Sequence, residues 1–258
     1  MFKELYRRDL LPWVVPGCIL VAWQATAQLG FIPARVLPAP TQVFAAAVKL
    51  IRSGEIFRHI GVSSLRALAG LLVGGSIGFT FGLLNGLSRT SDRLLNSTLQ
   101  MVRNVPHLAL IPLCILWFGI DEGSKVFLVA FGVFFPIYLN TYHGIQNVNP
   151  GLIEMGRVYG LSGYELFRDV LFPAALPAML VGVRYALGIM WLTLIVAETV
   201  SASSGIGYMT MTAREFLQTD IIVLGILIYA LLGKLADVST LLLERRWLAW
   251  HPAFQKTA

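Results

Sequence analysis

The segment 64–87 reads SLRALAGLLVGGSIGFTFGLLNGL, and five of its glycines recur at every fourth position. They are Gly70, Gly74, Gly78, Gly82 and Gly86. Positions four apart lie on one face of an α-helix, so these glycines form a smooth stripe along an apolar helix. In a bilayer, such a stripe allows two helix backbones to approach closely. The stripe predicts tight helix packing, either within the chain or at a sliding or dimeric surface.

Five other apolar stretches accompany this one, each about as long as the roughly 20 residues that cross a hydrocarbon core. They cover residues 11–32, 98–120, 124–143, 174–199 and 220–243. Hydrophobic residues make up 56% of the 258 residues and charged residues only 13%, whereas soluble domains carry about 25% charged residues. We therefore expect an all-α integral membrane protein with about six transmembrane helices, embedded in a lipid bilayer.

The connecting segments predict the orientation, because cytoplasmic loops carry more Lys and Arg than external ones. Their distribution favours cytoplasmic N- and C-termini. The segment 33–63 would then lie outside, as a short amphipathic helix on the membrane surface. The basic N-terminus and the trio at 25–27 imitate a secretory signal, but the apolar stretch continues beyond it, so we expect a retained first helix. The expected divisions are 1–63 and a core at 64–258.

Several classes of function are disfavoured by the same sequence. The formal net charge is +6, but no basic run with interleaved aromatic residues is present, so a nucleic acid is not an expected partner. The four His and two Cys have no ligand spacing, so no metal site is predicted. No Gly-x4-Gly-Lys-Ser/Thr phosphate loop occurs, so we expect neither ATP hydrolysis nor a bound cofactor in this chain. A membrane enzyme would need a convergent His, Ser or carboxylate set, which is not visible.

The segment 144–173 is the longest predicted cytoplasmic connection, and its pattern is that of a folded unit. A helix is expected after Pro150, a break at Gly160 to Gly163, and then a second short helix that Pro173 ends. Ser162 is a candidate N-cap for the second helix, with Glu165 as its capping-box partner. Two short helices joined by glycines predict a compact projection from the membrane.

This projection resembles the signature of ABC importer permeases, which reads Glu-Ala-Ala, three residues, Gly, nine residues, then Ile-x-Leu-Pro. The chain has Glu154-Met155-Gly156, then Gly160, then Val170-Leu171-Phe172-Pro173, with the same spacing and with small or apolar replacements. Other stretches are similar to the taurine, nitrate and aliphatic-sulfonate branch of these permeases, closest to its aliphatic sulfonate permeases. They are residues 103–112, 117–119, 190–199, 204–208, 213–220 and 231–237.

The resemblance implies a type I importer permease in a bacterial inner membrane. It implies a homodimer, two cytoplasmic ATPase subunits that bind ATP and Mg, and an external or periplasmic substrate-binding protein. The residues that would couple to the ATPase are Glu154, Gly156, Gly160, Leu161, Ser162, Gly163 and Pro173. The expected cargo is a small anion such as an aliphatic sulfonate; nitrate, taurine or another small solute stays open. A secondary transporter without an ATPase is the alternative class.

Charged groups inside membrane spans are costly and are functional candidates. Arg184 lies about ten residues into the fifth predicted span, and Arg103 lies early in the third. Either guanidinium would attract an anion along the path, which we expect to include His107 and Glu198. Two alternatives remain: Arg184 pairs with Glu198 or with a neighbouring helix, and Arg103 lies at the cytoplasmic interface.

Overall fold

The computed structural model describes residues 2–250, with side chains from residue 11 onward except that of Pro12. Within these residues the chain is helical and contains no strand. The elements in chain order are α1 (Phe2–Gln28), α2 (Pro40–Ser53), α3 (Glu55–Leu87), α4 (Arg89–Arg103), η1 (His107–Leu110), α5 (Ile111–Phe118), α6 (Glu122–Gln146), α7 (Pro150–Val158), α8 (Gly163–Leu166), η2 (Phe167–Leu171), α9 (Phe172–Ser201), α10 (Ile206–Glu215) and α11 (Thr219–Trp247).

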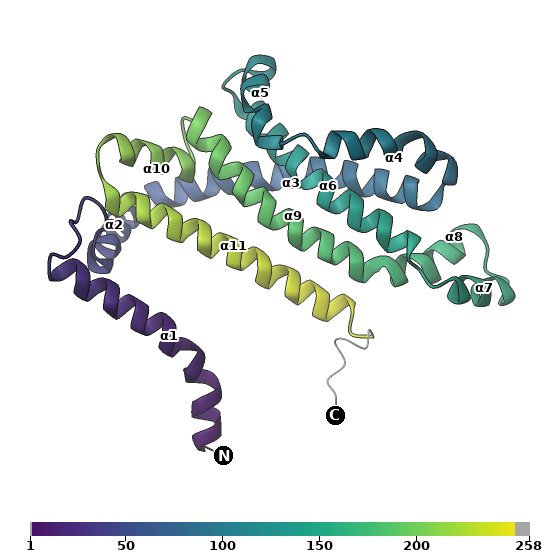
Figure 1. Ribbon diagram of the computed structural model, residues 1–258, viewed down its shortest axis with the longest axis horizontal. Coiled ribbons are helices and arrows are strands. Elements are labelled where there is room, and N and C mark those ends of the chain that lie inside the picture. Colours follow the sequence, from purple (N-terminus) through teal and green to yellow (C-terminus); the bar gives the residue numbers. More distant parts are fainter. Residues whose placement is uncertain (1, 251–258) are drawn as a thin grey trace.

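Long helices form the centre of the molecule, with short helices at both ends. Helix α6 packs against α3 on one side and α9 on the other, and α11 packs against α9. Helices α7 and α8 project at one end of this bundle, whereas α2 and α10 lie at the opposite end (Figure 1). The segments 33–63 and 144–173, which the sequence assigns to opposite sides of the membrane, therefore lie at opposite ends.

The glycine stripe of α3 faces α6 inside the same chain. A Cβ atom on Gly70 would lie 2.5 Å from Val129 Cγ1, and one on Gly78 would lie 2.5 Å from the Phe134 carbonyl oxygen. At Gly74 the added carbon would overlap the backbone of Ala130. The sequence left open whether the stripe packs within the chain or at a sliding or dimeric surface. In the structure it packs within the chain, against α6. Around the stripe lies an apolar core of seven buried residues: Ala67, Val129, Val133, Ile137, Ala186, Met190 and Leu194.

Four helical segments of the described residues are long and apolar enough to cross a membrane: Glu55–Leu87, Glu122–Gln146, Gly163–Ser201 and Thr219–Trp247. They include the predicted second, fourth, fifth and sixth spans. The first predicted span falls on α1, where some side chains lie outside the described residues.

The predicted third span, 98–120, is not one straight helix. The chain bends by 80° between α4 and the helical segment His107–Phe118. Pro106 lies at this break and Pro112 follows in the first turn of α5. Since a proline disfavours helical backbone at the residue before it and lacks an N–H, the helix ends before Pro106. Only if the bent pair counts as one crossing do the described residues supply a fifth span.

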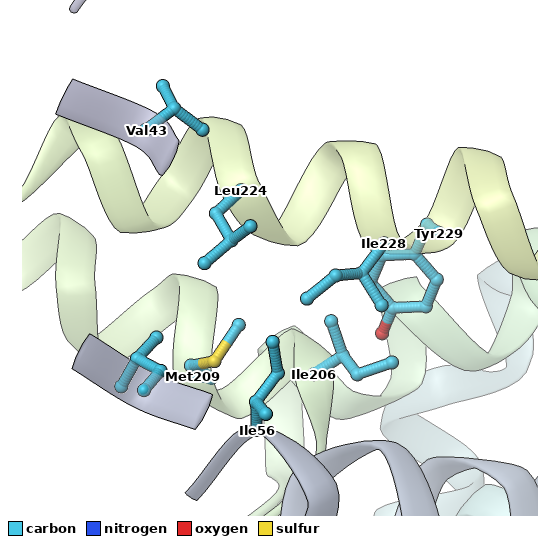
Figure 2. Packing of buried hydrophobic residues seen from close by; sticks show 8 residues of the cluster. Val43, Ile56, Ile206, Met209, Leu224, Ile228 and Tyr229 are labelled. Atoms are coloured by element: carbon cyan, nitrogen blue, oxygen red, sulfur yellow. The ribbon is translucent and has the colours of Figure 1, made fainter. Parts of the chain in front are cut away.

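A second apolar cluster joins the short helices to the bundle at the end opposite α7 and α8. Val43 of α2 and Ile56 of α3 meet Ile206 and Met209 of α10, and Leu224, Ile228 and Tyr229 of α11 (Figure 2). Helix α2 is amphipathic, as the sequence predicts, and its buried face packs on α11. Helix α1 ends beside α2, where Trp23 Nε1 donates to the Pro38 carbonyl over 3.1 Å.

The fifth span extends further than the sequence predicts. Gly163 to Ser201 form one helical run of 39 residues through α8, the π-helical turn η2 and α9. Pro173 lies in the first turn of α9 and does not end a helix, so the predicted proline stop is wrong. In a first turn the missing N–H of proline costs no helical hydrogen bond, and the π-helical turn before it shifts the bonding pattern.

Candidate functional site

The first candidate site is the projection formed by residues 150–171, here called the knob. Asn149 precedes α7, and its side chain accepts a hydrogen bond from the Gly151 N–H over 2.9 Å. The chain then turns at Gly160, which has φ +85°, and enters α8 at Gly163, which has φ +50°. Both angles favour glycine, because a Cβ atom is strained in this left-handed region. The Leu161 N–H closes the turn on the Gly156 carbonyl over 3.0 Å.

Gly156 lies where the two short helices of the knob touch. It is buried, and a Cβ atom there would lie 2.8 Å from Leu166 Cδ1 and 3.3 Å from Val170 Cγ2. A larger residue would have to displace the ends of these two side chains. The predicted capping box is wrong: Ser162 occupies the N-cap position of α8, but its side chain makes no capping hydrogen bond. The segment from 163 continues into a long helix, so this short first turn is held by the rest of that helix.

The outer surface of the knob carries several large apolar side chains that are exposed, among charged ones. Val158 is 85% exposed, Tyr159 79% and Tyr164 72%, and Met155 is also exposed. Glu154 lies exposed on α7 and forms no ion pair within the described residues. On a surface outside the bilayer, a concentration of exposed apolar side chains commonly marks a binding site for a partner. This end of the molecule therefore has the character of a protein docking surface.

The second candidate site is a pocket of about 320 Å³ beside the break between α4 and η1. We call it the central pocket. Its walls come from the break, from α6 and from α9, and they include Arg103, His107, Phe131, Asn140, Tyr185 and Ile189. The α6 and α9 residues lie near the middle of their helices, so the pocket lies about halfway along the bundle. Of the four residues expected along a path, Arg103 and His107 line it.

Local features of α6 and α9 give this pocket its shape. His107 Nε2 lies 3.1 Å from Thr193 Oγ1 of α9. A Cβ atom on Gly132 would lie 3.1 Å from the same Oγ1 and 3.5 Å from the His107 ring, so glycine leaves room for the imidazole. Pro136, inside α6, removes the N–H that would bond to the Gly132 carbonyl. Its own carbonyl accepts from Asn140 Nδ2 over 2.8 Å, which orients this amide.

Arg184 and Glu198 lie elsewhere. Arg184 Nη2 donates to Glu244 Oε2 of α11 over 2.5 Å, so it pairs with a neighbouring helix. It does not pair with Glu198, and it lines a separate pocket with Lys234 and Asp237. The sequence left the pairing of Arg184 with a neighbouring helix open as an alternative to a role in the path, and the structure has this contact.

Glu198 is the centre of a buried polar cluster near the α10 end. Its carboxylate accepts from Ser63 Oγ over 2.8 and 2.9 Å, from the Gly207 N–H over 2.9 Å and from the Tyr229 hydroxyl over 3.1 Å. Arg66 Nη1 donates to it over 2.8 Å, and the side chain of Glu198 is 0% exposed. These contacts join α3, α9, α10 and α11 around one carboxylate.

Arg66 completes this cluster and was missed by the sequence analysis. Its guanidinium binds both oxygens of Glu122 at the start of α6 and donates to the Ser204 carbonyl over 2.6 Å. It is only 3% exposed. Arg66 lies inside the predicted span 64–87, so the rule that singled out Arg103 and Arg184 would also have found it.

The chain resembles known transport proteins over most of its length. The family described as "Binding-protein-dependent transport system inner membrane component" matches residues 70–249. The chain is 60% identical to the "Putative aliphatic sulfonates transport permease protein SsuC" of Escherichia coli (strain K12), covering 94% of this chain and 92% of that protein. Its identity to the protein of the same name from Bacillus subtilis (strain 168) is 46%, over 94% and 88%. The "Taurine transport system permease protein TauC" of Escherichia coli (strain K12) is 32% identical, over 92% and 88%.

Solved structures share the fold. A chain from the "Crystal structure of an amino acid ABC transporter with histidines" has a TM-score of 0.64 at 17% identity, covering 79% of this chain and 98% of that one. A chain of the MetNI methionine ABC transporter in an inward-facing conformation has a TM-score of 0.54 at 16% identity, covering 74% and 94%. The helix arrangement is therefore that of ABC transporter permeases.

Proposed function

The chain belongs to the family of binding-protein-dependent transport system inner membrane components, and from this premise we propose that it carries an aliphatic sulfonate across the membrane. It is an ABC importer permease. The sulfonate is supported by the 60% identity, over 94% of the chain, to a protein named for aliphatic sulfonates. Taurine, itself a sulfonate, is the second candidate, favoured by the 32% identity to a taurine permease.

The knob is the observation that carries the mechanism. We propose that two copies of the chain bind two cytoplasmic ATPase subunits, one at each knob, and that an external binding protein delivers the sulfonate. The chain itself has no phosphate loop, so the energy would come from the partner, which holds the ATP and Mg. The exposed apolar residues Val158, Tyr159 and Tyr164 would be covered by the ATPase. Closure of the ATPase pair would then move the knobs together as rigid bodies.

The same proposal fixes the orientation. A knob that binds a cytoplasmic ATPase places the opposite end, with α2 and α10, outside the cell, where it would receive the binding protein. Trp250, just after α11, lines a pocket together with Leu152 and Met155 of the knob, which supports a cytoplasmic location for the end of α11 under this proposal. The C-terminal residues 251–258 lie outside the described residues.

Reconstitution tests the proposal. The permease, its ATPase and its binding protein are placed in liposomes, and ATP-dependent uptake of radiolabelled hexanesulfonate and taurine is measured. We expect hexanesulfonate uptake that requires all three components. Uptake by the permease alone without ATP would make it a secondary transporter and contradict the proposal. ATP-dependent uptake of taurine but not hexanesulfonate would retain the importer and change its substrate.

Gly160→Val is expected to abolish coupling. A β-branched residue is strained at the φ of +85° that the knob needs at this position. Such strain costs about 1–3 kcal/mol, and it would distort the knob. We therefore expect uptake to fall at least about tenfold. Membrane insertion and the yield of the permease should be unchanged. Co-purification of the ATPase and the uptake rate are the measurements.

Two further variants separate strain from added bulk. Gly160→Asn should retain more uptake than Gly160→Val, because asparagine tolerates the left-handed region better than valine does. Gly61→Val adds the same side chain near the start of α3, where no atom lies within 4 Å of the added Cβ. Equal losses in all three variants would show that the backbone angle of Gly160 has no special role.

A further inference from the structure

The central pocket combines one unpaired charge with an apolar lining. Arg103 is exposed at its wall, and no carboxylate of the described residues lies within ion-pair distance of this guanidinium. Arg66 and Arg184, which also lie within helices of the bundle, both pair with glutamates. An arginine at mid-depth in a membrane is costly without a counter-charge. The described residues supply no such counter-charge to Arg103. Its place at the C-terminal end of α4 offsets only a small part of this cost.

The rest of the lining complements a particular kind of ligand. Among the residues that the structure describes, Arg103 supplies the only charged side chain of the lining, and no acidic residue lines the pocket. Asn140 uses one amide N–H on the Pro136 carbonyl, which leaves its second N–H for a ligand. Tyr185 adds a hydroxyl group. On the other walls, Phe131, Phe135 and Ile189 supply apolar surface.

We propose that the central pocket is a binding site within the membrane for the anion in transit. The ligand class is a small organic anion with a compact oxyanion head and a short apolar tail. Arg103 would bind the oxyanion, since its planar guanidinium forms two parallel hydrogen bonds to such groups. Asn140 and Tyr185 would bind the same head, and Phe131 and Phe135 would contact the tail. A volume of about 320 Å³ lies at the lower end of the range for small-molecule sites.

This inference rests on the proposed function for the direction of transport but not for the binding itself. The site lies on the permease, so it would hold the anion after release from the binding protein. Binding to the permease without the binding protein therefore tests the pocket, whereas uptake tests the importer. The two tests can fail separately.

The experiment uses the permease with its ATPase in lipid nanodiscs and measures equilibrium binding of radiolabelled hexanesulfonate without the binding protein. Arg103→Gln should weaken binding by about tenfold to a hundredfold, the effect of losing a charge-assisted hydrogen bond. Arg103→Lys should fall between Arg103→Gln and the parent. Arg93→Gln is the matched control, because Arg93 lies on the same helix but does not line the pocket; it should bind as the parent does.

Tyr185→Phe keeps the ring and removes only the hydroxyl, so it should weaken binding severalfold without affecting folding. If Arg103→Gln fails to fold, as judged by loss of ATPase binding, Arg103→Lys and Tyr185→Phe decide the result. Binding of hexanesulfonate by the parent that both Arg103 variants and Tyr185→Phe leave unchanged would overturn the proposal. Uptake in liposomes by a parent complex that binds no hexanesulfonate without the binding protein would also overturn it, while leaving the importer intact. Arginine-dependent binding without uptake would retain the pocket and contradict the proposed function.

Discussion

Replacing Gly74 with alanine is expected to leave little folded permease in the membrane. The added Cβ would overlap the carbonyl oxygen, carbonyl carbon and Cα of Ala130. These are backbone atoms of a packed helix, so no side-chain rotation relieves the overlap, and α3 and α6 would have to separate. Overpacking typically costs about 1–3 kcal/mol and sometimes more, and we expect the upper end here. The unfolding temperature of the purified protein in detergent and its yield are the measurements.

The neighbouring glycine supplies the control. A Cβ atom on Gly75 would lie 3.1 Å from Cδ1 of Ile137, the end of a flexible side chain. Gly75→Ala should therefore change stability little, since alanine also favours the helix by about 1 kcal/mol. If Gly74→Ala and Gly75→Ala unfold at the same temperature, the close approach of α3 to Ala130 is not what holds these helices together.

Arg66→Met is expected to have the second large effect. It would leave Glu198 as a carboxylate with 0% exposure, bound only to the neutral donors Ser63, Gly207 and Tyr229. Removal of one partner from a buried ion pair typically costs about 3–5 kcal/mol, because the remaining charge is uncompensated. The variant should unfold at a clearly lower temperature in detergent and yield less protein.

The double variant Arg66→Met/Glu198→Gln tests this explanation. Glutamine keeps the shape of glutamate and removes the charge, so the double variant should be more stable than Arg66→Met alone. If instead the stability losses of the two single variants add, so that the double variant is the least stable, the lost charge balance is not the cause. In that case the contacts of Arg66 with Glu122 and Ser204 would account for its effect.

Features that depend on neighbours in sequence could be predicted. The stripe from Gly70 to Gly86 predicted a close helix contact, since helical periodicity alone places these residues on one face. The turns at Gly160 and Gly163 followed from glycine in a short connection. Both glycines have the positive φ angles that such breaks require.

Features that depend on the direction of a helix or on contacts between distant residues could not be predicted from the sequence. A hydropathy pattern over 98–120 gives the length of an apolar segment but not its direction, so it did not predict the 80° bend at Pro106. Glu244 lies sixty residues from Arg184, and no periodicity links them. Arg66 meets Glu198 across 132 positions. The capping box at Ser162 failed because a long continuous helix, rather than a cap, holds the first turn of α8.

The unbroken helix from Gly163 to Ser201 has a mechanical consequence. At 1.5 Å per residue, 39 residues form a lever of about 58 Å. Its near end carries the outer face of the knob at Tyr164, its midpoint carries Tyr185 in the wall of the central pocket, and its far end carries Glu198. A small displacement of Tyr164 would therefore move the pocket wall at Tyr185 by about two-fifths as much when Glu198 acts as the fulcrum. With Glu198 held in place, this helix would convert a movement of the knob into a change in the width of the central pocket.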